Sequence, residues 1–176
     1  PKDNEIETKA AEHMFSNLIG FKKGPLSAFF TGQYRISFEI VSKDSGIAFY
    51  VAAPDEIATI VEKQINAAYP LAEIEIVTPP EIWDRGKFTK VAKLRLRGPE
   101  YFPIKEYEDL KNDTMSSITN AMSKMKENQV LALQYVIQPA TDSWRMAGRS
   151  FINRIKNANA NPEKKSNVSE SFLEAV

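Results

Sequence analysis

The residues of this sequence best spaced to bind a ligand are three basic side chains at alternate positions. Lys93, Arg95 and Arg97 alternate with apolar residues, and Lys87 and Lys90 precede them. Because successive side chains of a strand point to opposite faces, we expect the three cations on one face of a strand. Such a face could follow a phosphate backbone, as in proteins that bind single-stranded nucleic acid.

Two other interpretations of this basic face stay open. Single-strand binders also stack bases on aromatic side chains, and none is interleaved with the three cations. Phe88, Tyr101 and Phe102 lie near this segment but outside its alternation. The pattern is therefore also typical of a strand that basic side chains keep soluble, or of a surface that docks an acidic protein partner.

Residue types suited to catalysis or metal binding are few. The acidic pairs Glu73/Glu75 and Asp55/Glu56 lie in contexts without the burial that would tune a carboxyl group for acid–base work. His13 is the single histidine and cysteine is absent, so a zinc site or a Ser-His-Asp triad is hard to build. The patterns G-x-x-x-x-G-K-[ST], G-x-G-x-x-G and G-x-S-x-G are absent too. We expect no catalytic, cofactor-binding or metal-binding residue in this chain.

The elements that position these residues follow from the periodicity of apolar positions. Helices are expected at 5–19, 54–69, from 113 or 114 onward, and from Asp142 to about Lys156; strands are expected at 33–41, 47–52, 73–77, 91–97 and 129–137. The first two strands form a hairpin around the turn at 43–46, and the segment 21–32 is expected to be a loop. The order α-ββ-α-β-β-α-β-α predicts an α+β fold. We expect one mixed sheet of about five strands layered with helices, a variant of the ferredoxin-like pattern.

The segment from Asn128 to Lys156 combines a buried strand with an amphipathic helix. Pro139 joins the two, and the apolar stripe of the helix runs from Trp144 to Ile155. We expect both parts to pack in the core, so that function lies on the surfaces that they support.

Length and charge restrict the function further. The 176 residues suit one α+β domain at 1–157 followed by a polar, flexible tail at 158–176. Because 23 basic residues balance 23 acidic ones, binding to nucleic acid or to an anionic membrane would need a local patch. No apolar run reaches the roughly 18–20 residues of a membrane helix. The chain begins at Pro1, and we expect it to be a piece of a longer protein in the cytoplasm.

Four segments carry a family resemblance, which covers roughly residues 1–156 in constant order. They are PKDNEIETKAAEHMFSNLIG, ISFEIVSKDSGIAFYVAAPDEIATIVEKQINAAYPLAEIEIV, KVAKLRLRGPEYFPIKEYEDL and DTMSSITNAMSKMKENQVLALQYVIQPATDSW with the helix after it. Together they resemble the N-terminal, non-ATPase region of type IV secretion (conjugation-type) ATPases, a coupling-protein-like family of small-genome and Gram-positive bacteria. Ala52 and Ala53 depart from that pattern, in which a bulkier aromatic residue is expected.

The resemblance implies a non-catalytic cytoplasmic domain of a membrane-associated protein. In that family the region precedes a P-loop motor domain that drives DNA or protein transfer, so no catalytic residue and no cofactor site carry over to this chain. Its implied role is to position the motor or receive substrate, with other subunits or its own ATPase domain as partners. The alternative is a module that binds single-stranded nucleic acid through Lys93, Arg95 and Arg97.

Overall fold

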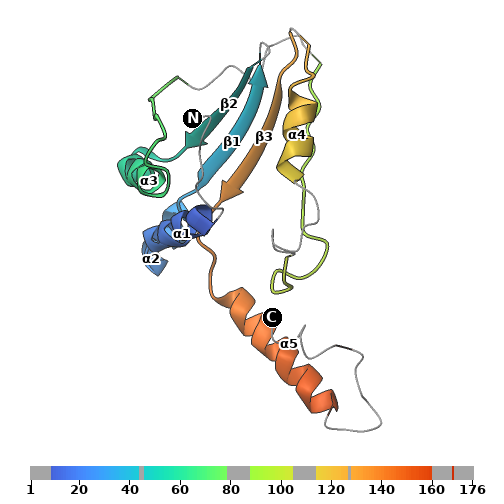
Figure 1. Ribbon diagram of the computed structural model, residues 1–176. Coiled ribbons are helices and arrows are strands. Elements are labelled where there is room, and N and C mark those ends of the chain that lie inside the picture. The colour runs from blue at the N-terminus through green and yellow to red at the C-terminus, as the bar shows by residue number, and fades with distance from the viewer. Residues whose placement is uncertain are drawn as a thin grey trace. The chain divides into compact units, whose positions relative to one another are not determined.

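A computed structural model describes residues 9–43, 46–78, 88–104, 114–126, 128–159 and 168. The chain divides into two compact units. The first comprises Pro1–Lys87 and Met115–Pro139, and the second comprises Phe88–Thr114 and Ala140–Val176. Figure 1 labels the helices and strands of both units.

An antiparallel sheet of three strands forms the centre of the first unit (Figure 1). β1 (Ile36–Lys43) lies between β2 (Gly46–Ala52) and β3 (Leu131–Ile137), so the strand order is β2-β1-β3. The register places Phe38 opposite Val51 in β2 and Tyr135 in β3. Because side chains alternate between faces, these three residues share one face of the sheet.

Two helices pack against that face. α1 (Lys9–Leu18) continues into the 3-10 helix η1 (Ile19–Phe21), and α3 (Asp55–Ala68) follows β2. Their buried residues meet β1 in a core cluster that consists of Leu18, Ile36, Ile57 and Val61. The Phe15 ring of α1 meets the Phe38 ring of β1 edge-on, with the ring centroids 5.2 Å apart.

Local sequence explains where α3 begins and ends. Pro54 precedes the helix with the φ angle that a first helical turn requires, and Asp55 and Glu56 place negative charge at the positive end of the helix dipole. The helix ends at Ala68, because Pro70 disfavours the α conformation in Tyr69.

The short helix α4 (Thr114–Met122) belongs to the first unit from Met115 onward, and a buried hydrogen bond connects its last residue to the sheet. The Ser42 hydroxyl of β1 donates a hydrogen bond of 2.8 Å to the backbone carbonyl of Met122. Ser42 and Met122 are each 1% exposed, so this hydrogen bond lies in the interior.

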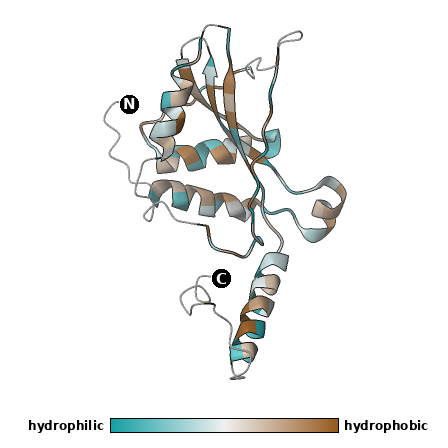
Figure 2. Cartoon of the chain, turned by 90° about the vertical axis from the view of Figure 1, so that its right-hand side faces the viewer, coloured by the Kyte–Doolittle hydropathy of each residue, from teal (hydrophilic) through white to brown (hydrophobic). Residues whose placement is uncertain are grey.

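The second unit is built around α5 (Ser143–Asn159). Phe151 lies with its ring centroid 5.5 Å from those of Tyr101 and Phe102, so an aromatic cluster joins α5 to the segment 88–104. Figure 2 shows hydrophobic residues along α5. Gly148 is buried and Trp144 is half-buried, so the expected apolar stripe packs in part.

The α+β class, the β1–β2 hairpin, α3, β3 and α5 are confirmed. The expected burial of β3 in the core is wrong, because none of its residues is buried and Tyr135 and Val136 are 50% and 61% exposed. Two expected strands are not seen, because residues 73–77 and 91–97 are neither helix nor strand in the structure. In the described part of the chain the sheet therefore has three strands, and the ferredoxin-like layout of about five is not seen. Both segments alternate as strands do, but alternation forms a strand only where a neighbouring strand supplies hydrogen bonds.

The expected loop at 21–32 is also wrong, because it contains the helix α2 (Pro25–Thr31). Proline at the first helical position starts this helix, since its φ angle is already helical and its missing N–H would have no partner there. Three expectations lie outside the described residues. They are the start of the first helix at residue 5, the cap at Asp113, and the tail at 158–176 apart from Val168 and the last turn of α5. Within the described ranges, no helix has the length and apolar character needed to cross a membrane.

Candidate interaction site

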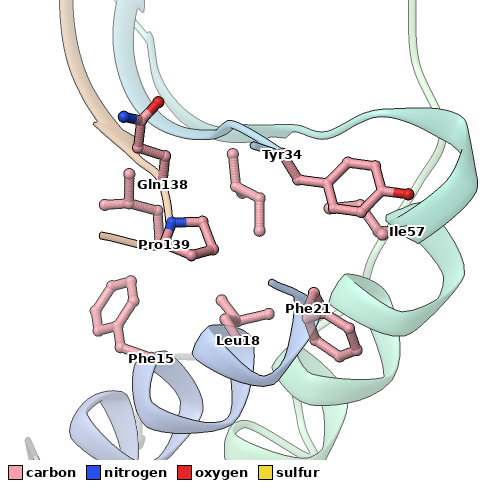
Figure 3. Close-up of a pocket in the computed structure, with 9 residues that line it drawn as sticks. Phe15, Leu18, Phe21, Tyr34, Ile57, Gln138 and Pro139 are labelled. Atoms are coloured by element: carbon pink, nitrogen blue, oxygen red, sulfur yellow. The ribbon is translucent and has the colours of Figure 1, made fainter. Parts of the chain in front are cut away.

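An apolar pocket of about 260 Å³ opens at one end of the sheet in the first unit (Figure 3). It lies where β1 begins and β3 ends, beside α1, η1 and α3. The residues that line it are Phe15, Leu18, Phe21, Tyr34, Ile36, Ile57, Ile137, Gln138 and Pro139. In Figure 3 their side chains surround an open centre.

Antiparallel pairing brings the two strand ends of the pocket together. Ile36 at the start of β1 is paired with Ile137 at the end of β3, so their side chains are neighbours on one face. Pro139 follows β3 and cannot donate a ladder hydrogen bond, which stops the strand at the pocket wall. The 3-10 turn after α1 carries Phe21 to the opposite wall (Figure 3).

The rim of the pocket carries cations and an amide. Arg35 Nε donates a hydrogen bond of 3.2 Å to Gln138 Oε1. Lys23 Nζ lies 4.2 Å from the centroid of the Tyr34 ring, a cation–π contact that holds the lysine beside the pocket. The pocket therefore has an apolar interior, and two cations contact residues of its lining.

This composition suits recognition of an apolar group. Tyr34 is the one titratable side chain among the nine that line the pocket. Aromatic and aliphatic walls with a few polar groups at the rim are typical of sites that take an apolar group and orient it.

The basic residues singled out in the sequence lie in the second unit. Lys93, Arg95 and Arg97 are exposed in an irregular segment, so the strand that would align them on one face is not present. Lys90 Nζ lies 5.5 Å from the centroid of the Phe88 ring, and Phe88 is 85% exposed. An exposed aromatic ring and four exposed cations thus occur within one short segment.

The structure does not bring the other candidate residues together into a site. Glu73 and Glu75 are exposed in an irregular segment, whereas Asp55 and Glu56 are exposed in the first turn of α3. His13 is exposed on α1. Among the residues that the structure describes, no group of three or more His, Cys, Asp or Glu could hold a metal ion.

Comparison with known proteins gives a family. The model of a domain of unknown function, DUF8128, matches residues 1–170. This chain belongs to the DUF8128 family. No curated protein and no solved structure matches it.

Sequence reasoning missed two features of this DUF8128 chain. The pocket has no local signal, because its lining residues come from α1, η1, β1, α3 and the end of β3. The second feature is the apolar face of α2, where Leu26, Phe29 and Phe30 are 74%, 83% and 75% exposed. Their spacing at i, i+3 and i+4 after a Gly-Pro pair could have indicated an amphipathic helix.

Proposed function

We propose that this chain is a non-catalytic interaction domain of a type IV secretion (conjugation-type) ATPase, lying on the cytoplasmic side of the membrane. Its role would be to position the motor or to receive substrate. The resemblance over roughly residues 1–156 supports the secretion context. The apolar pocket with its cationic rim is the observation that carries the interaction role.

The chemistry of the pocket indicates what the partner presents. A volume of about 260 Å³ accommodates an aromatic or branched aliphatic side chain, and such anchors in apolar pockets supply much of the affinity of protein interfaces. Arg35 and Lys23 at the rim favour an acidic residue beside the anchor. The proposed partner is therefore a segment of the motor domain, or of another subunit, with an apolar anchor flanked by acidic residues.

A substitution at the pocket mouth tests this role. Gln138 is exposed, so Gln138→Trp places a bulky ring over the opening without changing the core. We expect the dissociation constant for the purified motor domain of the same protein, measured by calorimetry, to rise at least about tenfold.

Gln134→Trp is the matched control. Gln134 is exposed in β3, donates to Glu39 Oε1 at 3.0 Å and does not line the pocket, so its replacement should leave affinity within about twofold. If Gln138→Trp binds the motor domain as tightly as the unaltered chain, with an unchanged circular dichroism spectrum, the pocket is not the interface.

A module that binds single-stranded nucleic acid is the second candidate, favoured by the segment around Phe88. Its exposed ring can stack on a base, while Lys90, Lys93, Arg95 and Arg97 can neutralise phosphates. This candidate does not require a strand, because extended irregular segments also follow single-stranded backbones.

The ferredoxin-like layout of about five strands is also a proposal. The alternation of Ile74 and Ile76 with acidic residues, and of Leu94 and Leu96 with basic ones, supports strand formation in the assembled protein. All four side chains are exposed, so each segment has apolar surface that a partner strand could cover.

A further inference from the structure

Helix α2 turns its apolar face toward solvent. Leu26, Phe29 and Phe30 lie at i, i+3 and i+4, so they share one face of the helix, and each is at least 74% exposed. Ala28 is half-buried. The three exposed side chains present apolar surface on the order of 500 Å², which reaches the size of patches that mark binding sites.

Polar contacts fix α2 in this orientation. The backbone N–H of Lys23 donates to Gln33 Oε1 at 2.8 Å, and Gln33 Nε2 donates back to the Lys23 carbonyl at 3.2 Å. Lys23 Nζ also donates to Thr31 Oγ1 at 3.0 Å. These hydrogen bonds connect Lys23, before α2, with Thr31 at the end of the helix and Gln33 after it. They fix the position of the helix without contacts from its apolar face.

The C-terminal end of the helix is held as well. The N–H of Gly32 donates to the Ala28 carbonyl at 2.9 Å, with a φ of 71° at Gly32 that favours glycine. The Phe29 and Phe30 rings pack edge-on with centroids 5.3 Å apart. The apolar face of α2 therefore projects from the protein on a helix whose end is fixed by a hydrogen bond.

The stretch of sequence that contains this projection carries charge of one sign. From His13 to Phe38 the sequence contains no Asp or Glu, while Lys22, Lys23 and Arg35 lie there. Lys23 Nζ donates to Thr31 Oγ1 in α2, so this lysine places positive charge beside the helix. Lys22 is exposed at the entry to α2.

We propose that α2 anchors the protein on the surface of a bilayer that contains anionic lipids. Leu26, Phe29 and Phe30 insert at the boundary between headgroups and acyl chains, and the neighbouring cations lie at the level of the phosphates. Apolar aromatic residues combined with flanking Lys and Arg are the composition of interfacial anchors.

The charge complementarity favours a lipid surface over a second copy of this chain. Two copies joined through α2 would bring like charges together, since cations flank the face in both. An anionic bilayer instead attracts those cations while it takes up the apolar side chains. A helix this short gives reversible binding that needs both contributions. The apolar face of α2 shares no residue with the lining of the pocket, although Lys23 is used in both arguments, so this inference goes beyond the proposed function and does not rest on it.

Co-sedimentation of the whole chain with vesicles tests the anchor. We expect binding to vesicles of phosphatidylcholine with phosphatidylserine, and weaker binding to phosphatidylcholine alone. Phe29→Ser with Phe30→Ser should lower the partition coefficient at least about tenfold, because both side chains are exposed and contribute to insertion. Lys22→Gln should lower it about fivefold on anionic vesicles and have little effect on neutral ones.

Phe49→Ser is the matched control, because Phe49 is 72% exposed in β2 and is not flanked by cations. Leu71→Ser, in the exposed segment after α3, is a second control. Both should bind vesicles as the unaltered chain does. The double phenylalanine variant should retain its circular dichroism spectrum and any affinity for the motor domain, which separates this test from that of the pocket.

Three results would overturn the proposal. The first is an unaltered chain that does not bind anionic vesicles. The second is a double phenylalanine variant that binds them as tightly as the unaltered chain. The third is a vesicle-free dimer, seen by light scattering, that the same double variant abolishes, because α2 would then be an interface between two copies.

Discussion

Replacing Ser42 with alanine should loosen α4 from the sheet and lower the free energy of unfolding. The Ser42 hydroxyl donates to the Met122 carbonyl at 2.8 Å, and both residues are almost fully buried. Met122 ends α4, and its carbonyl also accepts a hydrogen bond of 3.2 Å from the Met125 N–H in the turn that follows. The substitution removes one of the two donors to this buried carbonyl, which costs about 0.5–1.5 kcal/mol, the net contribution of one hydrogen bond.

Urea denaturation measures this cost, and hydrogen exchange locates it. We expect the unfolding midpoint to fall and the amides of α4 to lose more protection than those of α3. Ser123→Ala is the control, because Ser123 Oγ donates to the nearby Asn120 carbonyl at an exposed position, and its loss should cost less than about 0.5 kcal/mol. Equal midpoints for the Ser42→Ala and Ser123→Ala variants would show that the buried hydrogen bond does not hold α4.

Two further predictions concern the exposed segments. If residues 88–97 bind single-stranded DNA, a plot of the logarithm of the association constant against the logarithm of the salt concentration should have a slope of about −2 for three phosphate contacts. Arg95→Glu with Arg97→Glu should abolish binding at low salt. The control Lys63→Glu with Lys124→Glu, at exposed positions elsewhere, should not. No binding by the unaltered chain at low salt would exclude this module. If residues 73–77 and 91–97 become strands in the assembled protein, their amides should gain at least about tenfold protection from hydrogen exchange when the motor domain is added, and unchanged exchange alongside demonstrated binding would contradict the five-strand layout.

Local signals predicted the hairpin, whose two strands follow one another in sequence, and also β3, which pairs with the distant β1. The alternation of Ile36 and Ile40 with polar residues, together with the strand that follows at once, predicted the hairpin of β1 and β2. The apolar run at 131–137 predicted β3 as a buried strand; the strand is present, but none of its residues is buried. The alternation at 73–77 is equally clear, but pairing depends on a distant neighbour that sequence periodicity does not specify.

The candidate sites were less predictable than the fold. The pocket requires Phe15, Tyr34, Ile57 and Pro139 to converge from separate elements, and no spacing within one segment encodes that convergence. For α2, the loop predicted at 21–32 is wrong because Gly24 and Gly32 frame a helix instead of replacing it. The basic residues were correctly expected at the surface, but the alignment predicted for them depended on a strand that is not present.

The strand order has a consequence for synthesis on the ribosome. β1 is the central strand, yet its two neighbours are made far apart in time, because β3 follows β2 by about eighty residues. At typical translation rates of 5–20 residues per second, that interval is on the order of ten seconds. By then the hairpin and α3 have left the ribosome, but the edge of β1 that pairs with β3 is still unpaired. During this interval the nascent chain exposes unpaired backbone beside Ile36 and Ile40, and chaperone binding should be strongest before β3 is translated.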